Sequence, residues 1–118
     1  MGPANEGGMV DWSAALESTG GDSTLLQELI EVFLDEGPAL LQAIRSALEN
    51  RDGPLLRRSA HTLKGSLRIF GATRGVELAQ EIESRGQQEV WDGTAELCRD
   101  LEAYMTPVIA ELKTRGNG

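Results

Sequence analysis

The chain has 118 residues, of which 40% are hydrophobic and 25% are charged, a composition typical of one globular domain. Its 19 acidic and 11 basic residues give a net charge of −8, which argues against a general binder of nucleic acids or anionic membranes. Because the chain has one cysteine and no apolar run near the roughly 18 residues of a membrane span, we expect a cytoplasmic protein without an internal disulfide or membrane insertion.

The N-terminal segment is polar and rich in glycine. We therefore expect residues 1–10 to form a flexible tail and residues 11–115 to form the domain. The domain is predicted to open with a short helix from Asp11, a suitable N-cap, to about Ser18.

A long helix is predicted next, starting at Asp22 or Ser23 and ending before a turn at residues 50–54. From Leu25 onward its apolar residues recur at steps of three and four, which predicts one buried stripe. The Gly37-Pro38 pair predicts a kink or a restart, because proline removes a backbone donor and crowds the preceding turn.

Three further helices are predicted by the same periodicity: from Pro54 to about Phe70, from Thr73 to Arg85 with Gly86 as its stop, and from Asp92 or Thr94 to Lys113, bent at Pro107. Four long amphipathic helices with short connections bury their stripes most simply by packing against one another. We therefore predict an all-α fold, an antiparallel up-and-down four-helix bundle with the short N-terminal helix across it.

The only histidine, His61, lies at the centre of the polar face of the predicted helix over residues 54–70, opposite its apolar residues. No acidic residue occurs between Gly53 and Val76. The chain, although strongly acidic, therefore surrounds its one imidazole with positive charge from four residues: Arg57, Arg58, Lys64 and Arg68.

Four basic residues on one helix face are, on charge alone, most often a solubilising surface. Gly65 favours a functional reading, because a glycine inside a helix costs about 1 kcal/mol relative to alanine and any polar residue would fit an exposed position. Its place one turn after His61 predicts that another molecule approaches the backbone closely beside the imidazole.

An exposed imidazole is mostly uncharged at neutral pH, and its free lone pair is then available for nucleophilic attack. Lys64 and Arg68 lie where they would neutralise phosphoryl oxygens. The chain has neither a G-x-x-x-x-G-K-[ST] nor a G-x-G-x-x-G motif, so we expect no kinase activity of its own. The pattern predicts a helix that carries a phosphoryl group supplied by a partner.

The segment Ala60–Ala72, AHTLKGSLRIFGA, resembles the signature of histidine-containing phosphotransfer (HPt) domains of two-component phosphorelay signalling. Leu78–Glu83, LAQEIE, resembles the part of the family pattern that follows, and Leu29–Phe33 is similar to the family's usual first bundle helix. The resemblance covers about residues 22–112.

This resemblance implies a role for each matching residue. His61 would be the phosphoacceptor through Nε2, Lys64 would stabilise the phosphoryl group, and Gly65 would let a partner's loops close over the imidazole. Glu83, 22 residues after the histidine, would accept a hydrogen bond from the other ring nitrogen and orient the ring. An ordinary solvated carboxylate at Glu83 is an equal alternative.

The resemblance also implies partners. The phosphoryl group would come from a receiver-domain aspartyl phosphate or a sensor histidine kinase and pass to the aspartate of a response regulator. The receiver would supply the Mg²⁺, so no cofactor is expected on this chain. Contacts to the partner are expected from Arg57, Arg58 and Arg68, with Ile69 at the border of the histidine face. No unusual apolar face demands a dimer, and we expect a monomer.

Two other interpretations are compatible with a histidine on a basic helix. The dimerising helices of a sensor kinase carry an acidic residue directly after the histidine and a proline soon after it, whereas this chain has Thr62 and no proline until Pro107. A non-catalytic helical adaptor would bind an acidic partner through the same basic face without using His61. Cys98 is expected at or near the core, with no sign of a nucleophilic role.

Overall fold

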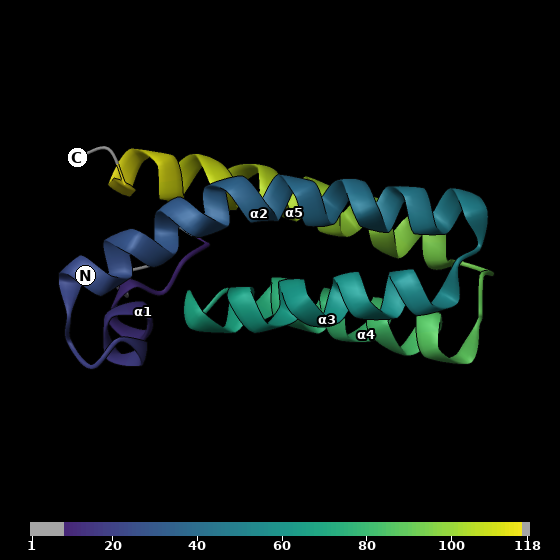
Figure 1. Cartoon of the computed structure of the whole chain (residues 1–118), viewed down its shortest axis with the longest axis horizontal. Coiled ribbons are helices and arrows are strands. Elements are labelled where there is room, and N and C mark those ends of the chain that lie inside the picture. Colours follow the sequence, from purple (N-terminus) through teal and green to yellow (C-terminus); the bar gives the residue numbers. More distant parts are fainter. Residues whose placement is uncertain (1–8, 117–118) are drawn as a thin grey trace.

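The computed structural model describes residues 9–116, and it is all-helical (Figure 1). The helices are α1 (Trp12–Ser18), α2 (Ser23–Asn50), α3 (Gly53–Ile69), α4 (Thr73–Gln88) and α5 (Thr94–Gly116). Within this described range, no helix is both long enough and apolar enough to cross a membrane.

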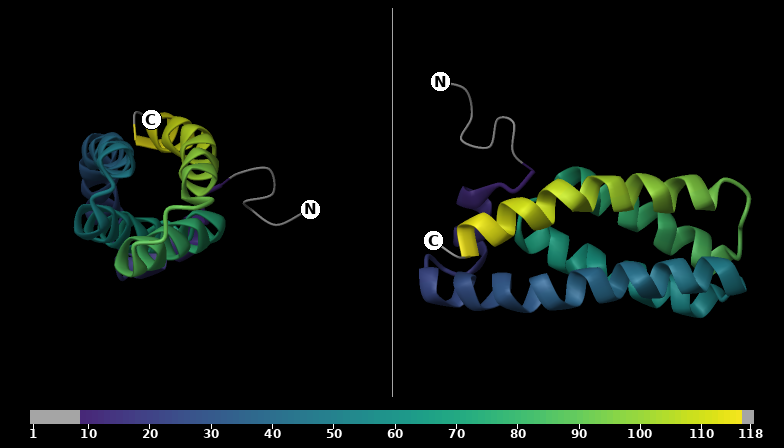
Figure 2. Two further views of the ribbon diagram at one scale, coloured as in Figure 1. Left: turned by 90° about the vertical axis from the view of Figure 1, so that its right-hand side faces the viewer. Right: turned by 90° about the horizontal axis from the view of Figure 1, so that it is seen from above.

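Helices α2 to α5 run alternately up and down and form a four-helix bundle (Figures 1 and 2). Around the bundle, α3 contacts α2 and α4, and α5 contacts the same two helices from the other side. The short helix α1 lies at the end of the bundle where α3 turns into α4, and it contacts α2 and α3. The predicted fold, a four-helix bundle with a short extra N-terminal helix, is confirmed.

Aspartate side chains set the start of three helices. Asp11 accepts a hydrogen bond from the Ala14 amide, 3.1 Å away, at the start of α1. Asp22 does the same for α2, and Asp52 for α3. Each carboxylate satisfies backbone amides that have no partner within the first turn, which explains why the helices begin at these residues.

The core lies along the inner faces of the four long helices. Phe33 of α2 and Phe70, just after α3, pack with ring centroids 5.4 Å apart. The fully buried side chains include residues of every long helix: Ile30, Leu56, Leu63, Leu67, Ile82, Leu101, Met105, Val108 and Leu112. Their spacing of three and four residues is the physical reason that these segments are helices rather than strands.

The N-terminal boundary of the domain differs from the prediction. Residues 1–8 of the predicted flexible tail lie outside the described residues, but Val10 is fully buried in the core. The Met9 amide donates a hydrogen bond to Glu111 Oε1 of α5, at 2.8 Å, and Trp12 Nε1 donates to the other oxygen at 2.7 Å. The tail prediction is therefore wrong for residues 9 and 10, because Val10 fills the end of the bundle.

Both helices with an internal proline are continuous. Helix α2 continues through Pro38, so of the predicted kink or restart the restart does not occur, while Figure 1 shows that α2 changes direction along its length. Helix α5 continues through Pro107 and ends three residues after the predicted Lys113. Packing along the whole bundle compensates for the one backbone hydrogen bond that each proline removes.

Gly86 does not stop α4, which continues to Gln88 and is capped by Glu89 in a left-handed conformation. Instead, Gly86 is buried where α4 packs against the backbone of α3. A Cβ atom there would lie 2.7 Å from the backbone nitrogen of Arg57 and 2.9 Å from the carbonyl oxygen of Gly53. The glycine is needed for helix packing rather than for a turn.

Substituting alanine at Gly86 and at Gly65 should have opposite effects on stability. Gly86→Ala inserts a methyl group against the α3 backbone and should lower the free energy of unfolding by about 2 kcal/mol. Gly65→Ala meets no atom within 4 Å and should raise it by about 0.5–1 kcal/mol, since alanine favours the helix. Urea unfolding of the two variants and the wild type tests both values; equal effects would mean that α3 and α4 are not packed as described.

Candidate functional site

The site is built on α3, whose apolar residues face the core and leave His61 in solvent. Leu56, Leu63 and Leu67 are fully buried. The His61 side chain is 63% exposed, so the predicted orientation of this helix is confirmed.

Glu83 of α4 contacts the ring of His61. Its Oε2 lies 2.9 Å from Nδ1, and its side chain is only 14% exposed. A carboxylate can only accept hydrogen bonds, so Nδ1 must carry the proton. The lone pair of the neutral ring is then on Nε2, the nitrogen that faces away from Glu83. The contact expected for Glu83 is therefore present, and it differs from that of an ordinary solvated carboxylate.

Lys64 is not on the exposed part of the basic face, where the helical wheel placed it. Its side chain is 9% exposed, and Nζ lies 2.7 Å from Glu83 Oε1 and 2.8 Å from Gln80 Oε1. The side chain is buried because α4 packs against the side of α3 that carries Lys64. The ammonium of Lys64 therefore lies between two side-chain oxygens of α4, those of Gln80 and Glu83. The wheel of a single helix contains no information about this neighbour.

The pKa of Glu83 is lowered from its ordinary value of 4.5. Burial by itself raises the pKa of this carboxyl group, but hydrogen bonds and positive charge from Lys64 and His61 outweigh burial. Glu83 is therefore ionised throughout the neutral range, as the contact with Nδ1 requires.

Three arginines remain exposed around His61. Arg57, Arg58 and Arg68 form no ion pair with any residue of the described range. Gly65 is exposed beside them, and the space next to its α-carbon is empty within 4 Å. Since Lys64 is paired with Glu83, the positive charge offered to solvent comes from the arginines.

An apolar surface borders the other side of α3 and was missed in the sequence. Val32 of α2 is 50% exposed, and with Leu29, Ser66 and Ile69 it lines a shallow cavity of about 40 Å³ between α2 and α3. Leu25 lies one turn before Leu29 on α2 and is exposed as well, at 41%. In the sequence, this surface appears as apolar residues at positions 25, 29 and 32, each one residue before a buried apolar residue at 26, 30 and 33. Leu25 was predicted to belong to the buried stripe of this helix, and that prediction is wrong because its side chain is exposed.

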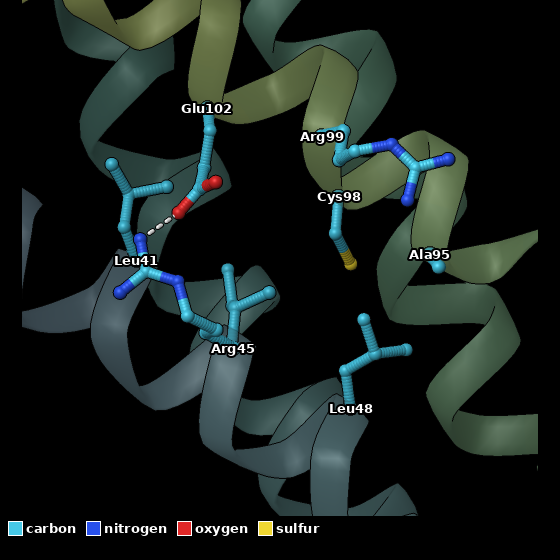
Figure 3. Close-up of a pocket in the computed structure, with 8 residues that line it drawn as sticks. Leu41, Arg45, Leu48, Ala95, Cys98, Arg99 and Glu102 are labelled. Atoms are coloured by element: carbon cyan, nitrogen blue, oxygen red, sulfur yellow. Dashed lines mark hydrogen bonds and ion pairs between the residues drawn. The ribbon is translucent and has the colours of Figure 1, made fainter.

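A larger cavity, of about 190 Å³, lies between α2 and α5 (Figure 3). It is lined by Leu48 and Cys98 among other residues, and Arg45 and Glu102 form an ion pair across it. Burial, with a smaller contribution from Glu102, raises the pKa of Cys98 to about 11, so this thiol is protonated at neutral pH. No residue of α3 or α4 lines this cavity, which separates it from the histidine face.

The Glu83 contacts should make stability depend on pH in a specific way. A carboxyl group with a lowered folded-state pKa contributes stability above its ordinary pKa and loses it as pH falls through the lowered value. We expect Glu83→Gln to be less stable than the wild type by about 1–2 kcal/mol at pH 7, with the difference shrinking below about pH 4.5. Urea unfolding of both proteins from pH 7 to pH 3 measures it; a difference that grows on acidification would contradict the ion pairing.

The comparisons with known proteins agree with this geometry. The sequence matches the Hpt domain family over residues 28–111. It is 28% identical over 108 residues to the signal transduction histidine-protein kinase BarA of Shigella flexneri, and equally to BarA of Escherichia coli strain K12. These alignments cover 92% of this chain but 11% of each relative, so the chain spans about a tenth of the length of these kinases.

Two solved structures share the fold. Histidine-containing phosphotransfer protein B (HptB) of Pseudomonas aeruginosa PAO1 matches with a TM-score of 0.84 at 19% identity, covering 92% of this chain and 95% of that one. The HPT domain of a sensor hybrid histidine kinase from Shewanella matches with a TM-score of 0.80 at 24% identity, covering 90% and 92%. With the family match over most of the bundle and a histidine exposed on α3, this chain belongs to the Hpt domain family of two-component phosphorelay signalling.

Proposed function

We propose that this Hpt domain carries a phosphoryl group on Nε2 of His61. The group is taken from the aspartyl phosphate of a receiver domain, or from a histidine kinase, and is passed to the aspartate of a response regulator. The observation that supports this most directly is the contact of Nδ1 with Glu83, because it directs the lone pair of an exposed ring to Nε2.

The transfer needs no other atom of the chain to react. The Nε2 lone pair attacks phosphorus, the bond from phosphorus to the aspartate oxygen breaks, and the aspartate leaves as a carboxylate. The ring becomes a phosphorylated imidazolium whose Nδ1 proton stays hydrogen-bonded to Glu83. The negative carboxylate stabilises this cation, and the reverse sequence returns the group to another aspartate.

The receiver domain would supply the metal ion for the transfer. We propose that Mg²⁺ bound by the receiver's acidic residues neutralises the phosphoryl oxygens during transfer. On the Hpt side, Arg57, Arg58 and Arg68 are exposed cations that attract the acidic rim of that site. The open space over Gly65 lets the partner's loops reach the imidazole.

The apolar line on α2 completes the docking surface. Leu29 and Val32 of α2 lie beside Ile69 of the histidine-bearing helix, and Leu25 precedes Leu29 by one turn of α2. We propose that an apolar patch of the receiver covers these residues while the arginines contact its charged rim. Burial of apolar area would provide most of the affinity, and the charges would orient the encounter.

The source of the phosphoryl group is proposed from the relatives. Both a histidine-protein kinase and a sensor hybrid histidine kinase contain domains similar to this chain. We infer that a hybrid sensor kinase stands upstream and that the Hpt domain itself is a carrier rather than a kinase.

Substitution of His61 distinguishes a carrier from a passive adaptor. His61→Gln should abolish acid-labile, base-stable label transferred from a panel of radiolabelled phospho-receivers, because glutamine offers no nucleophilic nitrogen. The helix content and thermal melting should not change, since the side chain is exposed. A wild-type protein that accepts no label from any receiver would contradict the relay function, and a His61→Gln variant that still binds and signals would indicate an adaptor.

Gly65 tests the need for close approach. Gly65→Gln should slow transfer from a phospho-receiver by about 100-fold, because a side chain of this size displaces the reacting groups. The same variant should react normally with phosphoramidate, a donor small enough to reach His61 without docking, and it should melt at or above the wild-type temperature. An equal loss with both donors would show that residue 65 affects the imidazole itself rather than docking.

A further inference from the structure

The cavity of about 190 Å³ between α2 and α5 has an apolar interior. Two of the residues that line it, Ile44 of α2 and Cys98 of α5, are buried. The partly buried residues Leu41, Leu48 and Ala95 extend the apolar wall on both helices. Figure 3 shows the thiol of Cys98 pointing toward Leu48, into the space between the two helices.

A space of this size and lining favours an apolar guest. Protein interiors are close-packed, so the atoms around such a space lack contacts that a bound apolar group would supply. Water gains little there because it needs polar partners, and the protonated thiol of Cys98 behaves as a small apolar group. Since a cavity of about 150 Å³ holds benzene, a space of this volume would hold about seven or eight carbon atoms.

The charged residues at this cavity favour a guest with one negative charge. They are two arginines and one glutamate, Arg45, Arg99 and Glu102, which together carry a net charge of +1. Arg45 and Glu102 pair with each other, whereas Arg99 is exposed and forms no ion pair with any residue of the described range. In Figure 3, Arg99 lies on the other side of Cys98 from that pair. One guanidinium at the mouth is therefore left for a ligand.

We propose that this cavity binds a monocarboxylate with an unbranched apolar chain, of which about seven or eight carbon atoms fill the cavity while the carboxylate pairs with Arg99. A planar guanidinium matches a carboxylate through two parallel hydrogen bonds. The charge of Glu102 is offset by Arg45, so it opposes such a ligand little. This inference goes beyond the proposed function and does not rest on it, because no residue of α3 or α4 lines the cavity.

A series of chain lengths tests the size of the site. In a titration of the full chain at pH 7 with sodium octanoate, ¹H–¹⁵N NMR should show saturable binding of one molecule with a Kd of about 0.1–1 mM. The largest shifts are expected at the amides of Leu48 and Cys98. Hexanoate should bind about 15-fold more weakly, because two buried methylene groups are lost. Decanoate should bind within about threefold of octanoate, because the cavity is already filled.

Filling the cavity with a side chain should prevent binding. Ala95→Leu should weaken octanoate binding at least about tenfold, because its side chain would occupy the space of the ligand. The matched control is Ala103→Leu, the same change at an exposed position of α5 outside the cavity, which should bind octanoate as the wild type does. Thermal melting shows whether each variant is folded, and Cys98→Leu replaces Ala95→Leu if the latter does not fold.

The charge of the ligand is tested at Arg99. Arg99→Gln should weaken octanoate binding about threefold at low salt, the size of an exposed ion pair, and should leave binding of 1-octanol unchanged. The matched control is Arg74→Gln on α4, which lies outside the cavity and should have no effect.

Three results would overturn the proposal. The first is no saturable binding of octanoate, or an affinity that rises as steeply from octanoate to decanoate as from hexanoate to octanoate. The second is equal binding to the wild type and to a folded cavity-filling variant. The third is equal binding of octanoate to the wild type and to Arg99→Gln, which would exclude an anionic ligand held by this residue. None of these measurements uses a phosphoryl donor, so their outcome is independent of the relay function.

Discussion

The site depends on the pairing of the Glu83 carboxylate with two residues of α3. The carboxylate is one charged group with two oxygens, and each oxygen contacts a different residue of α3, Lys64 through Oε1 and His61 through Oε2. A carboxylate with a largely buried side chain would be costly if it were unpaired. Here its pairing with a buried ammonium keeps it ionised, and its ionisation determines which nitrogen of an exposed ring carries the proton. A surface imidazole thereby acquires a defined tautomer without a binding pocket.

This arrangement requires α3 and α4 to pack closely against each other. Gly86 packs against the backbone of Gly53 and Arg57, where no larger residue would fit. The same close packing brings Glu83 within hydrogen-bond distance of a residue on the neighbouring helix. The two glycines therefore differ in their surroundings. Gly86 permits close packing of α4 against α3, whereas Gly65 leaves open space beside His61 that another molecule could enter.

The surface around His61 has three sectors with different chemistry. Toward α4 lies the ionic pair of Lys64 and Glu83, toward α2 lies the apolar line that includes Val32, and exposed arginines lie around the histidine on α3 itself. An acidic chain with a net charge of −8 has thus concentrated positive charge where an anionic phosphoryl group and an acidic receiver site would meet it. In the proposed transfer, the receiver rather than this chain would enclose Nε2 of His61, which is why an exposed ring is compatible with that function.

The helical period and the spacing of polar residues were sufficient to predict the bundle and the exposure of His61, because these follow from the geometry of single helices. The contact of Glu83 with His61 was expected only from the resemblance to the HPt family, with an ordinary solvated carboxylate as an equal alternative. Contacts between helices were not predictable in this way. The burial of Lys64, its contact with Gln80, the packing role of Gly86 and the burial of Val10 all depend on which neighbour lies against each residue. That information arises only when the helices pack, since a periodic pattern tells which face is apolar but not how close the next helix comes.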